Sequence, residues 1–278
     1  MRHHILLPTD FSENAWSAIL YALQLYANKP CTFYLLHTWS FKNPTSRTYI
    51  TSTFIDLNKE ETTQDLVDLR DKAKALRTNP DHKFETVFST EPLLDAIKNT
   101  IKNYNINLVI MATKGATGAK EFLFGSNTVN IVEKIRLCPV LIVPDAYDFI
   151  EPKQIAFPTD FNRFYGDELQ PLLELAELYS SKIQVVHVNI KDSLTEKQSY
   201  NLAMLKAYLE DHPSAINWKP NFGTKEEAIT EFIDEFDINI LTMINYKHSF
   251  IESFLNEPVI QKIGFHAMIP FLVVPEFK

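Results

Sequence analysis

The chain has 278 residues, of which 45% are hydrophobic and 22% are charged, and this length is sufficient for two domains of ordinary size. The formal net charge of −8 argues against a broad nucleic-acid surface, which would need a basic face, but it allows one small phosphate site. No segment approaches the ~18 apolar residues of a membrane span, and the apolar run near the N-terminus is too short for a signal peptide. We therefore expect a cytoplasmic protein with neither a membrane nor a nucleic acid as partner.

The first half alternates between strand and helix patterns. The apolar run at residues 5–7 predicts a strand that begins near His3, and the helical spacing after it predicts a helix that Ser12 can cap. The further predicted elements are a strand at 32–38, a helix through Leu66 to Leu76, a strand at 84–88, a helix at 94–104, a strand at 106–111, a helix opening at 127–132 and a strand at 139–143. Such alternation, with nearly continuous apolar strands, indicates a parallel sheet covered by helices on both faces.

The second half repeats the first in the same order. Residues 8–11, Pro-Thr-Asp-Phe, recur 150 positions later at 158–161. The Ile-Asn-Leu segment at 106–108 recurs only 132 positions later, as Ile-Asn-Ile. An ordered internal repeat of this length indicates two copies of one structural unit. We therefore predict two domains, residues 1–147 and 148–278.

The smaller offset places 18 surplus residues in the first half, between His37 and Ile106. Residues 40–59 are rich in Ser and Thr and show no periodicity, so they are the obvious carrier of this surplus. We expect this segment to form a mobile loop beside the carboxyl end of the second strand.

The two cysteines, Cys31 and Cys138, have no paired spacing, so we expect small buried thiols in a reducing compartment. The ligand clusters that zinc needs are missing from the sequence, and we predict no protein metal site. Mg²⁺ could still enter with a nucleotide, because it needs few protein ligands.

A glycine-bearing loop, residues 111–126, connects the predicted strand at 106–111 to the next helix. A helix that opens after such a loop is a ready anion site, since its first N–H groups are unpaired and its dipole favours negative charge. Gly125, Ser126 and the N–H of Asn127 could hold phosphates there, although a helix start with a serine cap would look the same. Gly115 could allow a ligand close to the backbone, or simply occupy a turn with positive φ.

This loop and the Pro-Thr-Asp segment resemble the universal stress protein family in its ATP-binding branch. The loop of that family runs Gly-x-x-Gly, nine residues, then Gly-Ser or Gly-Thr. Gly115, Gly125 and Ser126 match this pattern, whereas Ala112 replaces the first glycine. The resemblance covers essentially the whole chain as two tandem copies. It implies an α/β fold with two open parallel five-stranded sheets of strand order 3-2-1-4-5, packed through their last strands as an intramolecular pseudo-dimer. Whether two such chains form a homodimer stays open.

The resemblance also implies the residues of a nucleotide site in the first domain. Asp10 resembles the acidic residue that contacts the adenine-ribose part, although it could instead cap the first helix. Thr38 matches a position whose backbone contacts adenine, although it could be an ordinary strand end. The complete predicted set is Pro8, Thr9, Asp10, Thr38, Met111, Ala112, Gly115, Gly125, Ser126 and Asn127.

The corresponding loop of the second half lacks these features. Asn256 and Glu257 stand at the positions of Gly125 and Ser126, and Pro258 removes a backbone N–H at the expected helix start. A carboxylate at Glu257 would repel phosphate. We therefore predict one nucleotide per chain and a degenerate site in the second domain.

These observations predict an ATP-binding regulatory protein of the stress response, with ATP as its ligand and Mg²⁺ able to enter with the nucleotide. We find no nucleophile–base pair and no carboxylate pair in the loop, and so we expect no catalytic residues. Two alternatives stay open: a slow nucleotide hydrolase that uses the same crevice, and an interaction protein that binds no nucleotide.

Overall fold

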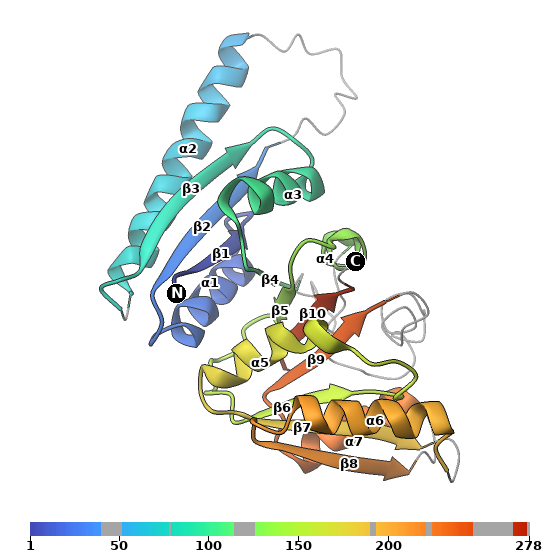
Figure 1. Cartoon of the computed structure of the whole chain (residues 1–278). Coiled ribbons are helices and arrows are strands. Elements are labelled where there is room, and N and C mark those ends of the chain that lie inside the picture. The colour runs from blue at the N-terminus through green and yellow to red at the C-terminus, as the bar shows by residue number, and fades with distance from the viewer. Residues whose placement is uncertain are drawn as a thin grey trace. The chain divides into compact units, whose positions relative to one another are not determined.

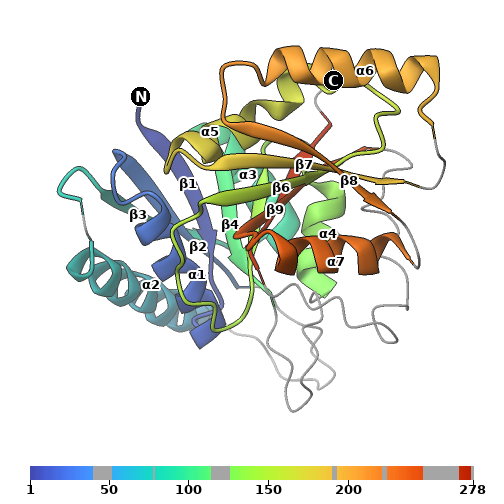
Figure 2. The ribbon, with the colours of Figure 1, turned by 90° about the horizontal axis from the view of Figure 1, so that it is seen from below.

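The computed structural model describes residues 1–39, 52–77, 79–113, 126–189, 193–220, 224–246 and 269–276. The chain divides into two compact units, Met1–Ala112 and Thr113–Lys278, and each is described by itself (Figures 1 and 2). Among the helices of the described residues, none combines the length and the apolar character needed to cross a membrane.

The first unit is a parallel sheet with helices on both faces. Its elements in chain order are β1 (His3–Pro8), α1 (Glu13–Leu25), β2 (Cys31–Thr38), α2 (Ser52–Ala75), β3 (Lys83–Ser89), α3 (Leu93–Tyr104) and β4 (Leu108–Ala112). The strands run in the order β3-β2-β1-β4, and their pairings are parallel. Figure 1 shows α2 and α3 on different sides of this sheet, as right-handed crossovers in opposite directions require.

Local sequence explains how the first unit begins. Ile5, Leu6 and Leu7 are almost completely buried, as expected for a strand covered on both faces. Ser12 caps α1, because its side chain accepts a hydrogen bond from the Ala15 N–H at 3.2 Å. The predicted start of the strand at His3 and the predicted cap at Ser12 are both confirmed.

The helix α2 begins earlier than the sequence predicted. It starts at Ser52, so the expectation of a loop over 40–59 is wrong for residues 52–59, whereas residues 40–51 lie outside the described residues. The equivalent helix of the second repeat, α6 (Glu196–Tyr208), has 13 residues against 24 in α2. The difference of 24 − 13 = 11 residues places much of the 18-residue surplus in a longer helix. Residues 52–59 are too short a stretch for helical periodicity to be recognised from the sequence alone.

The second unit carries the last two elements of the first repeat and the whole second repeat. Its elements are α4 (Ser126–Lys134), β5 (Val140–Val143), β6 (Gln154–Pro158), η1 (Gly166–Leu169), α5 (Gln170–Glu177), β7 (Lys182–Asn189), α6, β8 (Ser214–Pro220), α7 (Lys225–Glu235), β9 (Ile240–Asn245) and β10 (Phe271–Pro275). The strand order is β5-β10-β9-β6-β7-β8. The second repeat therefore runs 3-2-1-4-5, and the first unit shows the same order for strands 3-2-1-4, so the predicted fold class is confirmed.

The last strands of the two repeats pair with each other. β5 and β10 are antiparallel, with Leu141 opposite Leu272, while every other strand pairing described in this unit is parallel. This pairing confirms the predicted pseudo-dimer contact and removes two apolar strand edges from solvent. Because β5 pairs with β10, it belongs to the second compact unit. The boundary at residue 147, which follows the sequence repeat, stays a prediction.

A buried asparagine ties the first repeat's last helix to the second repeat. The Asn245 side chain donates to the Val132 carbonyl of α4 at 2.9 Å, and the Asn245 carbonyl accepts from Arg136 Nη1 at 3.3 Å. The Thr113 N–H donates to the Val143 carbonyl of β5 at 3.0 Å. Polar contacts of this kind fix the pairing register more specifically than apolar packing alone.

Candidate functional site

The carboxyl ends of β1, β2 and β4 form the candidate site of the first unit. β1 lies between β2 and β4, with Ile5 paired to Phe33 on one side and to Leu108 on the other. The chain leaves β1 toward β2 and later returns to β4, which makes this edge the topological switch point where open α/β sheets bind ligands. The predicted site residues gathered at this edge are Pro8, Thr9, Asp10, Thr38, Met111 and Ala112.

The turn after β1 is held by the side chain of Thr9. Its Oγ1 accepts from the Phe11 N–H at 3.0 Å, and its carbonyl lies 2.8 Å from His37 Nδ1. Since a carbonyl only accepts, His37 must carry its proton on Nδ1. Phe11 adopts a positive φ of 64° and stacks on His37 with 4.5 Å between ring centroids. These contacts offset the cost of the left-handed backbone, about 1–3 kcal/mol.

Asp10 presents an exposed carboxylate at this edge. Its Oδ1 accepts from the Ser12 N–H at 3.1 Å and from Ser12 Oγ at 2.5 Å. Asp10 therefore does not cap α1 itself; it orients Ser12, which does. Asp10 can orient Ser12 and still contact a nucleotide, because a carboxylate offers about four acceptor positions.

The rest of the predicted set lies beyond the first unit. Gly115 and Gly125 fall within residues 114–125, outside the described residues. Ser126 and Asn127 open α4 in the second unit, where the sequence placed a helix N-terminus. Thr113 was not predicted as a site residue. Its Oγ1 is buried and has no hydrogen-bond partner, and the sequence carries no sign of this.

The second repeat reproduces the turn closely. Thr159 Oγ1 accepts from the Phe161 N–H at 3.1 Å, and the Thr159 carbonyl lies 2.8 Å from His187 Nδ1. Phe161 has φ 56° and stacks on His187 at 4.8 Å. The turns differ in burial: Phe161 is 1% exposed and also meets Trp218 at 6.0 Å, whereas Phe11 is 36% exposed.

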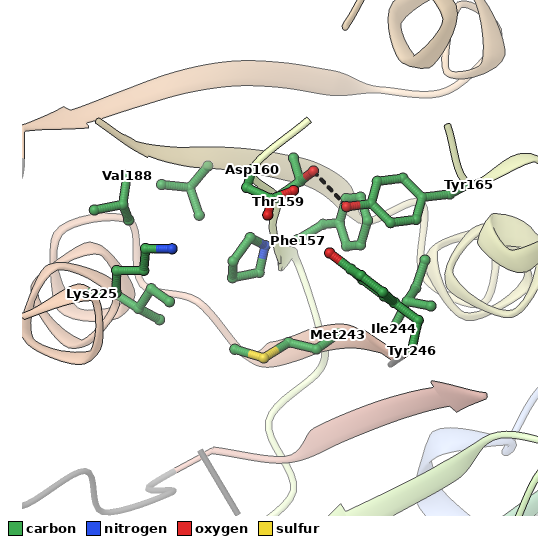
Figure 3. A pocket seen from close by; sticks show the side chains of 12 residues that line it. Phe157, Thr159, Asp160, Tyr165, Val188, Lys225, Met243, Ile244 and Tyr246 are labelled. Atoms are coloured by element: carbon green, nitrogen blue, oxygen red, sulfur yellow. Dashed lines mark hydrogen bonds between the residues drawn. The ribbon is translucent and has the colours of Figure 1, made fainter. Parts of the chain in front are cut away.

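A pocket opens beside this second turn, at the switch point between β6 and β9 (Figure 3). Its empty volume, including space open to solvent, is about 570 Å³. The lining residues are Phe157, Pro158, Thr159, Asp160, Tyr165, Val186, Val188, Lys225, Ile229, Met243, Ile244 and Tyr246. Sequence reasoning missed this pocket because it judged the second repeat by its phosphate loop, although the repeated Thr159-Asp160 was a sign of a second crevice.

Two tyrosines form one wall of the pocket. Tyr165 Oη lies 2.8 Å from Thr159 Oγ1, and the Tyr246 hydroxyl points into the pocket (Figure 3). Burial raises the pKa of both tyrosines, so both phenols are protonated and neutral at pH 7.

An ion-pair cluster supports this wall from behind. Arg163 bonds Glu168 Oε2 at 2.5 Å and Glu276 Oε1 at 3.0 Å, and its guanidinium lies 4.8 Å from the Tyr246 ring centroid. Burial opposes the charge of Arg163, but the two carboxylates outweigh it and raise the pKa of Arg163. The cluster holds the segment after β6 against the ends of β9 and β10.

Comparison with known proteins agrees with this architecture. The sequence model of the universal stress protein family matches residues 1–144. The chain therefore belongs to the universal stress protein family.

Individual relatives cover either one repeat or both. Universal stress protein YxiE of Bacillus subtilis is 24% identical over 148 residues, which are 51% of this chain and 99% of that protein. A universal stress protein from Archaeoglobus fulgidus has a similar structure over 98% of this chain and 96% of its own, with a TM-score of 0.72 and 17% identity. The functionally unknown protein PA1789 of Pseudomonas aeruginosa has a TM-score of 0.59 at 13% identity, covering 99% of this chain and 92% of its own. At these identities the structures show the fold alone.

Proposed function

We propose that the first repeat binds ATP and that the protein acts as a regulator in the stress response rather than as an enzyme. The observation that carries this proposal is the adjacency of β1 and β4 at the switch point. It puts the Thr9-Asp10 turn beside the strand end from which the glycine loop departs.

Each predicted residue has a role in this proposal. Asp10 would accept hydrogen bonds from the sugar hydroxyls, and the backbone at Thr38 would contact the base. The N–H groups at Gly125, Ser126 and Asn127 would bind the phosphates, since α4 begins at Ser126 and its first N–H groups need partners. Mg²⁺ would enter with the nucleotide and neutralise phosphate charge. Ala112 in place of glycine costs little where the backbone φ is negative.

Mass spectrometry of the ligand released from the purified protein tests the proposal most directly. Adenine nucleotide in the released fraction supports it. Calorimetric titration of the nucleotide-free protein should then give a stoichiometry near one ATP per chain. Gly125→Glu should abolish binding, because a carboxylate at the helix start repels phosphate.

The matched control is Asn256→Glu, which places the same carboxylate at the equivalent position of the second repeat. It should leave ATP binding intact. Binding that survives Gly125→Glu, or that disappears in Asn256→Glu, would contradict the assignment to the first repeat.

A further inference from the structure

The pocket of the second repeat differs in charge from a phosphate site. Among the described residues that line it, Asp160 and Lys225 are the two charged ones, so their formal charges cancel. The remaining polar groups are the hydroxyls of Thr159, Tyr165 and Tyr246, and the phenols stay neutral because burial raises their pKa. A polyphosphate in this pocket would be attracted by Lys225 but repelled by the Asp160 carboxylate, so the lining disfavours it.

Asp160 lies between Lys225 and the two tyrosines in the pocket (Figure 3). Figure 3 shows Lys225 reaching in from α7, Asp160 at the end of β6, and the Tyr246 hydroxyl entering from the far side. The position of Asp160 is fixed, because Oδ1 accepts from the Asn162 N–H at 2.9 Å and Oδ2 from Asn162 Nδ2 at 2.7 Å. Lys225 is fixed at its backbone, since it opens α7 directly after the capping residue Thr224.

The floor and sides of the pocket are apolar. They come from strand and helix residues rather than from loops, notably Val188, Ile229, Met243 and Ile244. Ile229, Met243 and Ile244 are almost fully buried, which makes this surface preformed. Burying an apolar body here is favourable, because it removes apolar surface from water.

We propose that this pocket binds a small zwitterion with an apolar body, the chemistry of a free apolar α-amino acid. The ligand ammonium would pair with Asp160 and its carboxylate with Lys225, while its side chain would cover the apolar surface. The site is distinct from the ATP site proposed for the first repeat and does not depend on it.

Three probes that share one aromatic ring test the charge requirement: L-phenylalanine, 3-phenylpropanoate and 2-phenylethylamine. Calorimetry on the full-length protein should show L-phenylalanine binding about ten- to a hundredfold tighter than either of the others, because each of these lacks one charge-assisted hydrogen bond. Equal affinity of the three probes, or no binding of L-phenylalanine at millimolar concentration, would overturn the proposal.

Two substitutions should change which of the three probes binds most tightly. Lys225→Gln, which retains the Thr224 cap and its capping box, should make 2-phenylethylamine bind at least as tightly as L-phenylalanine. Asp160→Asn should do the same for 3-phenylpropanoate. A uniform loss of all three probes in both variants, with unchanged thermal stability, would contradict the assignment of the two charges.

A matched pair of filling substitutions separates this site from the first repeat. Val188 and Thr38 occupy equivalent positions, 150 residues apart. Val188→Phe should abolish L-phenylalanine binding and leave ATP titration unchanged, while Thr38→Phe should leave L-phenylalanine binding unchanged. An ATP stoichiometry of two that falls to one in Val188→Phe would show that the pocket is a second nucleotide site and refute the proposal.

Discussion

The hydroxyl of Tyr165 lies 2.8 Å from Oγ1 of Thr159, and this hydrogen bond distinguishes the second turn from the first. At the offset of 150 residues, Tyr165 corresponds to Ala15, which has no hydroxyl. The Thr159 hydroxyl therefore hydrogen-bonds both the Phe161 N–H and the buried Tyr165 phenol, whereas the Thr9 hydroxyl accepts from the Phe11 N–H. The two repeats keep one backbone turn but place it in different surroundings.

Removing the two threonine hydroxyls should have unequal effects. We expect Thr159→Ala to lower the free energy of unfolding by about 2–4 kcal/mol, because it removes the buried hydroxyl that bonds both the Tyr165 phenol and the Phe161 N–H of the left-handed turn. Thr9→Ala should cost about 1–2 kcal/mol, since its turn is more exposed. Urea unfolding monitored by circular dichroism measures both. Thr159→Ser keeps the hydroxyl and is the control, and an equal loss in the two alanine variants would contradict this account.

The Arg163–Glu168 pair should show strong energetic coupling. Glu168 is 5% exposed, so Arg163→Met leaves a buried carboxylate without its guanidinium. The expected loss of stability lies at the lower end of about 3–5 kcal/mol, because the Arg163 side chain keeps some exposure. The double variant Arg163→Met/Glu168→Leu should recover most of it.

A surface ion pair provides the comparison for Arg163. Lys219 bridges Glu231 and Glu235, whose side chains are mostly exposed. Lys219→Met should change stability by only about 0–1 kcal/mol in the same urea experiment. A double variant of Arg163 and Glu168 that is no more stable than Arg163→Met would argue against coupling between the two charges.

Regular features of the sequence predicted the architecture well. The repeated Pro-Thr-Asp-Phe segments and the apolar strands predicted two copies of a parallel sheet, and the family resemblance implied its strand order. The Thr224-to-Glu227 spacing forms a capping box in the structure. These features succeed because they are local or periodic. The early start of α2 was missed because residues 52–59 are too short a stretch to show helical periodicity.

The candidate sites were harder to predict. Sequence comparison of the two repeats found the altered loop around Glu257, and this suggested that the second crevice had lost its function. The pocket depends instead on residues from four separate elements, such as Val188 and Ile229, whose convergence no local pattern reveals. Tyr165 belongs to an irregular segment before η1, whereas the corresponding Ala15 lies in the helix α1. Tertiary assembly, rather than any motif, creates this second site.

Cys31 should be almost inert in the folded protein. Burial raises its pKa from 9.0 to about 12, with the nearby Arg2 partly opposing the shift. The thiolate fraction at pH 8 should therefore fall about a thousandfold, since each pKa unit is tenfold. Alkylation by iodoacetamide in a Cys138→Ser variant measures this, with the protein in denaturant as the reference. Native labelling as fast as in denaturant would contradict it.

The same shift fixes the sign of a pH effect. The folded-state pKa lies above the unfolded value, so the stabilising contribution of the Cys31 thiol is complete below pH 9 and declines as pH rises toward 12. The stability difference between the protein and Cys31→Ala should therefore shrink over this interval. A difference that grows with pH would mean that the thiolate is favoured in the folded state.

Bound ATP should be hydrolysed slowly or not at all. Hydrolysis needs a positioned water and, usually, cations that stabilise charge at the γ-phosphate. The loop sequence supplies backbone N–H groups, Ser126 and two lysines, Lys114 and Lys120, but no arginine. Asp10 is the available carboxylate at the β1 end, but its Oδ1 is engaged by Ser12, and in the proposed pose it faces the sugar rather than the γ-phosphate. Binding without preferential stabilisation of the transition state gives occupancy, not rate.

Single-turnover measurement of phosphate release with Mg²⁺ tests whether bound ATP is hydrolysed. We expect rates far below the about 1–1000 s⁻¹ of typical enzymes. Asp160→Ala, the equivalent change in the second repeat, is the matched control and should have no effect. Phosphate release at enzymatic rates, abolished by Ser126→Ala or Asp10→Ala but retained in Asp160→Ala, would instead make the first repeat a hydrolase. Slow release in all variants, with ATP still bound, means that the nucleotide acts as a ligand whose occupancy, rather than its turnover, changes the protein.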